Sequence, residues 1–238
     1  MKPGTLYGIG VGPGDPELIT IKAVRALERV DVVYAAASTK NDYSVALDIA
    51  RPYLSKHPRI ETLGFPMTRD EAVLEKAWRE NAQAVAATLA QGNHAAFLTL
   101  GDPLLYSTFG YLLRTLKERH PEVVCQIIPG ITSFQAAAAR TQTILAESGE
   151  NIVVTSGVGR NETLKTILQK VDNAVILKTY RDFDRICDTL EELDLARGAV
   201  LVSRCGQEGE RIEHDVMGLR GEKMPYLSLL IVKRSGSR

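Results

Sequence analysis

The sequence predicts an α/β protein with two domains: a mainly parallel sheet flanked by helices, followed by a mixed α/β domain. Short apolar or β-branched runs alternate with longer segments of helical periodicity, a pattern typical of the crossover units that build parallel sheets. The alternation is regular over residues 1–130 and looser over 131–238, so we place the domain boundary between them. No Pro-rich or Ser-rich linker separates the halves, which predicts two closely packed domains.

Five strands and four helices are expected in the first half. The strand-length apolar runs lie at residues 5–11, 32–36, 60–65, 95–100 and 123–128. The helical segments lie at residues 18–29, 44–54, 70–91 and 107–120. Thr20 can cap the first helix, and Gly92 is a natural stop for the third. Pro52 lies within the second segment, which we expect to be helical in spite of it.

The second half opens with a helix of small residues over 132–140, for which Thr132 can serve as the cap. Further strands are expected at residues 152–155, 174–179, 199–203 and 226–233. Helices are expected at residues 162–170 and 184–193. The segment before the last strand is rich in turn-forming residues.

The composition excludes several classes of protein. Lys plus Arg and Asp plus Glu each number 29, so the formal charge is zero and the chain has no overall attraction for nucleic acid. Hydrophobic residues at 45% and charged residues at 24% are typical of a folded globular protein. No apolar stretch approaches the roughly 18 residues that span a bilayer, and the N-terminus does not resemble a secretory signal. We therefore expect a cytoplasmic protein without membrane contact.

The cysteines and histidines indicate no metal or redox site. Cys125, Cys187 and Cys205 are widely spaced and form no CxxC pair, so we expect reduced thiols in the core. The four histidines show no HExxH or other paired spacing. We expect no built-in metal.

The first strand ends in a glycine-rich turn, GIGVGPGDP at residues 8–16. Glycines at this position allow a backbone to approach a ligand closely, because no Cβ stands in the way. The turn is superficially like a dinucleotide fingerprint, but Pro13 or Asp15 occupies the position of the last glycine, and an acid there would repel a pyrophosphate. We therefore do not expect a nicotinamide or flavin site.

Two further turns follow later strands: Gly101-Asp102-Pro103 and PGITS at residues 129–133. Ligands of open α/β sheets bind outside the carboxyl ends of the strands, so these turns and the first one can converge on one crevice. Asp102 could accept hydrogen bonds from an amine or hydroxyl, and a helix starting near Thr132 could favour a carboxylate. A zwitterionic amino-acid ligand carrying an adenosine would suit this mixture.

Three segments carry a resemblance to a known family: GIGVGPGDPELITIKAVRAL at residues 8–27, LTLGDPLLYSTFGYL at 98–112 and IIPGITSFQAAAAR at 127–140. Together they resemble the tetrapyrrole methylase superfamily, whose members transfer methyl groups from S-adenosylmethionine. FPMTRD at residues 65–70 and GDPLLYSTFGYL at 101–112 are most similar to the C20-methyltransferases of cobalamin (vitamin B12) biosynthesis. Those enzymes act on precorrin-2 or on cobalt-factor II. The likeness runs over essentially the whole chain.

The resemblance implies the two-domain tetrapyrrole methylase fold, with S-adenosylmethionine bound in a cleft between the domains and leaving as S-adenosylhomocysteine. It also implies a small-molecule tetrapyrrole substrate and a homodimer. Carried over by position, the residues expected to bind the donor are Pro13, Gly101, Asp102, Leu105, Tyr106, Thr132, Ser133, Thr179, Gly206, Tyr226 and Leu227.

The chemistry of this transfer requires little of the protein beyond positioning, because an electron-rich meso carbon can itself attack the methyl group. No catalytic residue is assigned, and Tyr106 and Asp15 are both conceivable as a base. The substrate carries eight carboxylates, for which Lys40, Arg69 and Arg181 are candidate partners.

Several alternatives stay open. The chain could methylate a different precorrin carbon, or it could be a diphthine synthase; a ribosomal-RNA ribose methylase is disfavoured because no basic stripe is present. A regulatory module that binds S-adenosylmethionine without catalysis would keep the same turns. Whether the macrocycle enters with cobalt or without metal is not decided by the sequence.

Overall fold

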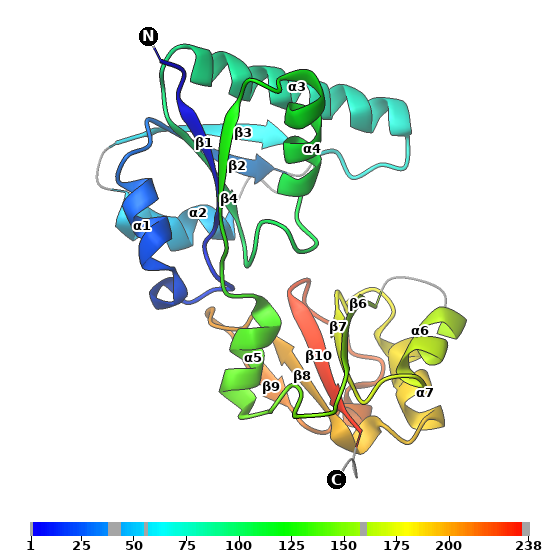
Figure 1. The fold of residues 1–238 in the computed structure, drawn as a ribbon. Helices are drawn as coiled ribbons and strands as arrows, with labels where there is room; N and C mark the ends of the chain where they lie inside the picture. Colours follow the sequence, from blue (N-terminus) through cyan, green and yellow to red (C-terminus); the bar gives the residue numbers. More distant parts are fainter. Residues whose placement is uncertain (1, 38–43, 55–56, 158–160, 235–238) are drawn as a thin grey trace. The chain divides into compact units, whose positions relative to one another are not determined.

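The computed structural model describes residues 2–37, 44–54, 57–157 and 161–234. The chain divides into two compact units, Met1–Thr132 and Ser133–Arg238, which we call unit 1 and unit 2 (Figure 1). No helix within the described ranges has the length and apolar character needed to cross a membrane.

Unit 1 is built on a five-stranded parallel sheet with the order β3-β2-β4-β1-β5. The strands are β1 (Thr5–Gly10), β2 (Val32–Ala37), β3 (Arg59–Gly64), β4 (Ala95–Thr99) and β5 (Val124–Ile128). β1 lies between β4 and β5, with Gly8 opposite Phe97 on one side and Ile127 on the other. The strand predictions for this half are confirmed to within a few residues.

Four helices cover the two faces of this sheet: α1 (Ile21–Leu27), α2 (Val45–Ala50), α3 (Glu71–Ala90) and α4 (Phe109–Arg119) (Figure 1). Side chains alternate between the faces, as the two-residue period of a strand requires. Leu6 and Phe97 belong to the core beneath α3 and α4. Ile9 and Leu98 belong to the core beneath α1 and α2.

Local signals explain where these helices begin and end. Thr20 Oγ1 accepts a hydrogen bond from the Ala23 N–H at 3.2 Å and caps α1. Gly92, at a φ of +86°, follows the end of α3. The predicted helical segment over 44–54 is confirmed as helical but is divided in two, because α2 ends at Ala50 and a 3-10 turn at Arg51–Tyr53 follows. Pro52 has no N–H with which to continue the α-helical ladder.

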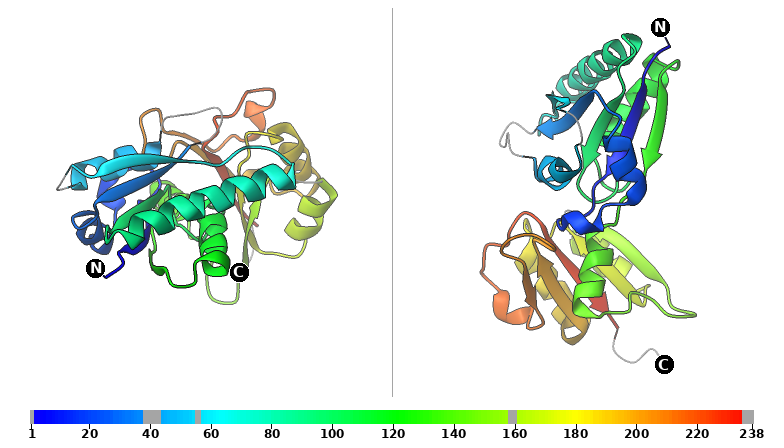
Figure 2. Two further views of the ribbon diagram at one scale, coloured as in Figure 1. Left: turned by 90° about the horizontal axis from the view of Figure 1, so that it is seen from above. Right: turned by 90° about the vertical axis from the view of Figure 1, so that its left-hand side faces the viewer.

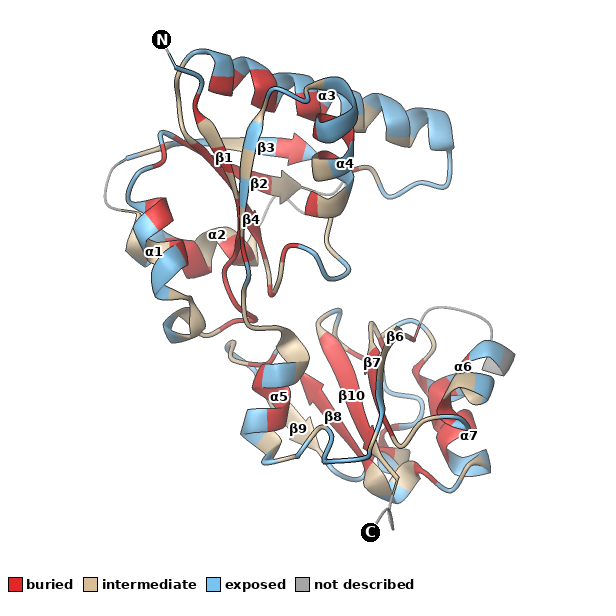
Figure 3. Ribbon diagram, viewed as in Figure 1, coloured by how far each residue is buried: buried red, intermediate tan, exposed pale blue. Residues whose placement is uncertain are grey.

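Unit 2 contains a mixed five-stranded sheet with the order β6-β7-β10-β8-β9. The strands are β6 (Ile152–Ser156), β7 (Asn173–Leu177), β8 (Ala199–Ser203), β9 (Arg211–Glu213) and β10 (Ser228–Lys233). β6 and β7 are parallel, and β10 is antiparallel to both of its neighbours. Figure 3 shows that β10, in the middle of the sheet, is buried along nearly its whole length.

The helices of unit 2 are α5 (Ser133–Thr141), α6 (Asn161–Leu168) and α7 (Phe183–Glu192). α5 contacts one face of the sheet at β10, and α6 and α7 cover the opposite face (Figure 2). β9 lies in the segment predicted only as turn-rich. It has three residues at a sheet edge and is too short to produce a recognisable alternation.

All three cysteines are free thiols. Cys187 and Cys205 are buried and Cys125 is half-buried. Burial raises the pKa of each thiol to about 11. The expected core location is thus confirmed for Cys187 and Cys205.

The native thiols are therefore expected to resist labelling. At about pH 8 a thiol with this pKa is thiolate in roughly one molecule per thousand, and the thiolate is the reactive form. A disulfide reagent should react slowly with the folded protein and rapidly with all three thiols in denaturant, as a colorimetric time course would record. A fast-reacting thiol in the folded protein would contradict the burial described here.

Candidate functional site

The strand order of unit 1 reverses direction between β1 and β4, so their carboxyl ends form a topological switch point. These strands are neighbours in the sheet, but α1 follows β1 to one face and α4 follows β4 to the other. The two connections therefore leave the sheet on opposite faces. Such a switch point is where open α/β sheets bind ligands.

The three predicted turns meet at this point. Gly12 and Gly101 form an isolated β-bridge, in which the Gly101 N–H donates to the Gly12 carbonyl at 2.7 Å. A Cβ on Gly10 would lie 2.5 Å from the Gly101 carbonyl oxygen, and one on Gly130 would lie 2.2 Å from the same atom. We call Gly10, Gly12, Gly101, Asp102 and Gly130 the turn junction. Only glycines allow three backbones to approach this closely.

Asp102 holds two turns of the junction together. Its Oδ2 accepts a hydrogen bond from the Gly130 N–H at 3.1 Å, and its Oδ1 accepts one from the Leu104 N–H at 2.9 Å. The carboxylate is only partly exposed. The structure therefore gives Asp102 a clear structural role, in addition to the ligand contact predicted for it.

Three other predicted residues of unit 1 lie within a few positions of the turn junction along the chain. Pro13 is buried directly after Gly12. Leu105 and Tyr106 are exposed at 37% and 51%, and Tyr106 has a φ of +50°. An added Cβ on Gly101 would find its nearest neighbours 4.0 Å away.

In unit 2 the predicted residues lie in the loops at one end of the central strands β7, β8 and β10. Because β10 is antiparallel to β7 and β8, its beginning lies beside their ends. The Arg204 N–H donates to the Leu227 carbonyl at 2.8 Å, and the Thr179 N–H donates to the Ser228 carbonyl at 3.4 Å. We call the loops at residues 178–180, 204–209 and 225–228 the sheet rim. It contains Thr179, Gly206, Tyr226 and Leu227.

Two hydroxyl groups near the rim have no hydrogen-bond partner. Thr179 and Ser203 are 0% and 1% exposed, and neither Oγ1 of Thr179 nor Oγ of Ser203 is paired in the structure. A buried polar group without a partner is unfavourable, so each such group needs an explanation. Thr179 was predicted as a ligand contact, whereas Ser203 was not.

Aromatic groups stand at the outer part of the rim. The rings of Tyr180 and Tyr226 lie 4.9 Å apart, and Tyr226 is 61% exposed. The Arg181 Nε donates to the Tyr180 hydroxyl at 2.8 Å. Partial desolvation, with the neighbouring Tyr180, raises the pKa of Tyr226 above its usual value.

The three basic residues predicted to bind the substrate carboxylates lie in different surroundings. Arg69 is exposed in the loop before α3, and Arg181 stands over the Tyr180 ring at 5.5 Å. Lys40 lies outside the described residues. Among those described, no group of three or more His, Cys, Asp or Glu side chains could hold a metal ion.

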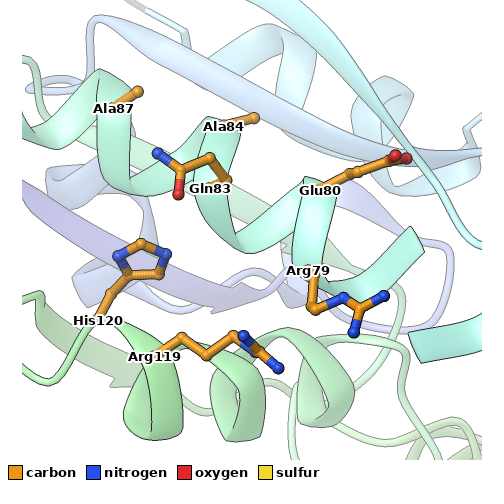
Figure 4. A pocket seen from close by; sticks show the side chains of 7 residues that line it. All are labelled: Arg79, Glu80, Gln83, Ala84, Ala87, Arg119 and His120. Carbon is orange, nitrogen blue, oxygen red and sulfur yellow. The ribbon is translucent and has the colours of Figure 1, made fainter. Parts of the chain in front are cut away.

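Two hollows occur in unit 1 away from the turn junction residues. One of about 660 Å³ lies between α3 and α4, with Arg79 and Arg119 extending into it (Figure 4). A second, of about 320 Å³, lies at the carboxyl ends of β2 and β3 and is lined in part by Phe65 and Pro66. No residue predicted to bind the donor lines either hollow.

A family model described as Tetrapyrrole (Corrin/Porphyrin) Methylases matches residues 5–219. The chain belongs to this family. Among tetrapyrrole methylases, it is 35% identical over 232 residues to the cobalt-precorrin-2 C(20)-methyltransferase of Salmonella typhimurium, covering 97% of each chain. It is 36% identical over 234 residues to a probable enzyme of the same name from Methanocaldococcus jannaschii, covering 96% of each. A precorrin-2 C(20)-methyltransferase from a Sinorhizobium species is 30% identical over 236 residues, covering 96% of this chain and 95% of the relative.

Solved structures of tetrapyrrole methylases share the fold. A cobalt precorrin-4 methyltransferase has a TM-score of 0.71 and 23% identity, covering 96% of this chain and 94% of that one. A uroporphyrin-III C-methyltransferase from Thermus thermophilus, complexed with S-adenosylhomocysteine, has a TM-score of 0.67 and 22% identity, covering 97% of this chain and 98% of that one. These likenesses confirm the predicted two-domain α/β fold of the family.

Proposed function

We propose that the protein transfers a methyl group from S-adenosylmethionine to C20 of a precorrin-2-type tetrapyrrole in cobalamin biosynthesis. The observation that carries the proposal is near full-length similarity to C20-methyltransferases. We propose the cobalt-containing macrocycle as the substrate, because the relatives named for it are 35% and 36% identical and the one named for the metal-free form is 30% identical.

We propose that the donor binds at the turn junction. Bound there, S-adenosylmethionine supplies a methyl group made electrophilic by its sulfonium charge. Gly101 offers backbone on which an added Cβ would meet nothing closer than 4.0 Å, and Leu105 and Tyr106 offer exposed side chains in the same turn. Pro13, Asp102 and Thr132 complete the proposed contacts of unit 1, and Ser133, the first residue of unit 2, is a further proposed contact.

From unit 2 we propose Thr179, Gly206, Tyr226 and Leu227 as further donor contacts. The unpaired Thr179 hydroxyl supports this assignment, because a polar ligand would satisfy a group that is otherwise buried without a partner. The two tyrosine rings of the rim supply flat apolar surface of the kind that an adenine stacks on.

The chain's own residues would contribute mainly by positioning. A rigid junction fixes where the methyl group points, and well-oriented reactants can gain about 7 to 11 kcal/mol in barrier height from placement alone. The carbon nucleophile belongs to the substrate, so no covalent intermediate on the protein is needed. We assign no catalytic base.

Thr179→Val tests one proposed contact separately. Because the hydroxyl is unpaired in the free protein, the variant should be as stable as the wild type or up to about 1 kcal/mol more stable in urea unfolding. Its affinity for S-adenosylhomocysteine should fall, as titration calorimetry would record. Thr189→Val is the control, since the Thr189 hydroxyl already donates to the Arg185 carbonyl at 3.0 Å. It should leave the affinity unchanged; an unaltered affinity in Thr179→Val would remove Thr179 from the site.

The activity itself is tested by anaerobic incubation with methyl-labelled S-adenosylmethionine and either cobalt-precorrin-2 or metal-free precorrin-2. We expect a gain of one methyl group, located at C20 by NMR, and a faster reaction with the cobalt form. Label at another carbon would refute the C20 assignment. Binding of the donor without transfer to either macrocycle would favour the non-catalytic module.

A homodimer and a cytoplasmic location stay predictions. Light scattering coupled to size-exclusion chromatography would check the first, with a mass of twice 26.1 kDa expected. A monomer at micromolar concentration would contradict it.

A further inference from the structure

We propose that Arg140 and Glu210 are positioning residues of the donor site, which hold the rim loop at residues 204–209 in the conformation that presents Gly206. The inference rests on the proposed function, because Gly206 is a proposed donor contact. Neither residue touches the donor in this proposal. Both act through the loop.

The loop has a backbone that needs support. Arg204, Gly206 and Gly209 all have positive φ, at +49°, +72° and +77°. A non-glycine residue such as Arg204 adopts this region at a cost in energy. Two successive turns follow, in which the Gln207 N–H donates to the Arg204 carbonyl at 2.9 Å and the Glu210 N–H donates to the Gln207 carbonyl at 3.1 Å. A segment built in this way keeps its shape only when something outside it fixes it.

Glu210 supplies the contact that closes the loop. Its Oε2 accepts a hydrogen bond from the Gly206 N–H at 2.7 Å, so the side chain spans the loop from its end back to its middle. The carboxylate is 16% exposed and is therefore screened less by water and salt than a surface group. This bond uses the Gly206 N–H, so the carboxylate fixes the position of the Gly206 backbone.

Arg140 fixes the carboxylate in turn. Its Nε lies 3.0 Å from Oε1 and 3.3 Å from Oε2 of Glu210, and its Nη2 lies 3.2 Å from Oε2. Because Arg140 contacts both oxygens, it fixes the orientation of the carboxylate plane and also pairs its negative charge. Arg140 stands in the last turn of α5, the helix that begins at Ser133, another proposed donor contact. The pair thus connects two segments assigned to the donor.

The charge on Glu210 is stable at neutral pH. Partial burial raises the pKa of Glu210, but the hydrogen bonds from Arg140 and Gly206 lower it by more than burial raises it. The resulting pKa lies below the usual value for a glutamate. The carboxylate is therefore ionised under assay conditions, and the bidentate pair is fully formed.

The test compares variants of the full chain for S-adenosylhomocysteine affinity and for steady-state kinetics with S-adenosylmethionine. Arg140→Met and Glu210→Gln should raise the Kd of S-adenosylhomocysteine and the KM for the donor about tenfold, with kcat within about twofold of wild type. Arg140→Lys keeps the charge but not the two-oxygen geometry, and should show a smaller rise. It also keeps the test meaningful if a more drastic variant fails to fold.

The matched control is Arg220→Met, which removes another ion pair of unit 2. Arg220 contacts Glu191 at 2.7 Å and Asp188 at 3.0 Å, and the residues of the rim loop take no part in these contacts. This variant should leave the Kd and KM unchanged. A rise equal to that of Arg140→Met would mean that the loss reflects general stability of unit 2, and would overturn the proposal.

Amide hydrogen exchange of the loop provides a readout that does not depend on activity. The peptide containing Gly206 should lose protection in Glu210→Gln and Arg140→Met and keep it in Arg220→Met. Loss of protection with unchanged Kd would refute the role in donor binding, and unchanged protection would refute the loop-holding role. A wild-type chain that does not bind the donor would instead refute the proposed function, while the exchange result still reports on the loop.

Discussion

Gly130→Ala is expected to destabilise unit 1 by about 3 kcal/mol and to abolish donor binding. The added Cβ would lie 2.2 Å from the Gly101 carbonyl oxygen and 2.7 Å from the carbonyl carbon of Gly10. Both neighbours are backbone atoms of strand ends, so neither can move aside without opening the turn junction. Urea unfolding and calorimetry with S-adenosylhomocysteine measure the two effects.

Gly110→Ala is the matched control for this substitution. Gly110 lies in α4, and no atom is within 4 Å of the position its Cβ would take. Alanine inside a helix is better than glycine by about 0.5 to 1 kcal/mol, so this variant should gain stability. A Gly130→Ala protein as stable as wild type would show that the three turns are not in contact.

Asp102→Ala should cost about 2 kcal/mol of stability and reduce methyl transfer by about two orders of magnitude. The substitution removes the acceptor for two backbone N–H groups, those of Leu104 and Gly130. Without it, the second and third turns of the junction lose their direct link, and the proposed binding surface loses its fixed shape. Unfolding curves and kcat/KM for the donor are the measurements.

Asp31→Ala is the control for losing an aspartate that binds backbone. Asp31 Oδ2 accepts a hydrogen bond from the His94 N–H at 2.9 Å, at the beginnings of β2 and β4 rather than at their ends. It should lose about 1 kcal/mol of stability with kcat/KM unchanged. If Asp102→Ala behaved in the same way as Asp31→Ala, the junction would have no part in the reaction.

The sequence predicts the strands of unit 1 well because their chemistry is local. Apolar runs of strand length end in glycine turns, and the close approach of Gly10, Gly101 and Gly130 follows from residues that carry no Cβ. The pattern does not show the change of helix type near Pro52, where the α-helix gives way to a 3-10 turn because proline cannot donate the next hydrogen bond. It also misses β9, which pairs with β8 through only three residues.

A local sequence pattern does not predict contacts between residues that are far apart along the chain. Arg140 and Glu210 are 70 positions apart, and their pairing appears only when α5 and the rim loop are placed by the fold. The linking role of Asp102 is similar, since its partner Gly130 lies 28 positions further on. The unpaired Ser203 hydroxyl also has no sequence signal, because serine at the end of a strand is ordinarily satisfied.

A crystal structure of the protein with S-adenosylhomocysteine at saturating concentration would show where the donor binds. We predict that the ligand lies against the Gly101 backbone, with Leu105 or Tyr106 in contact. Density for the ligand elsewhere, for example in the hollow between α3 and α4, with the turn junction untouched, would contradict the assignment of the donor site.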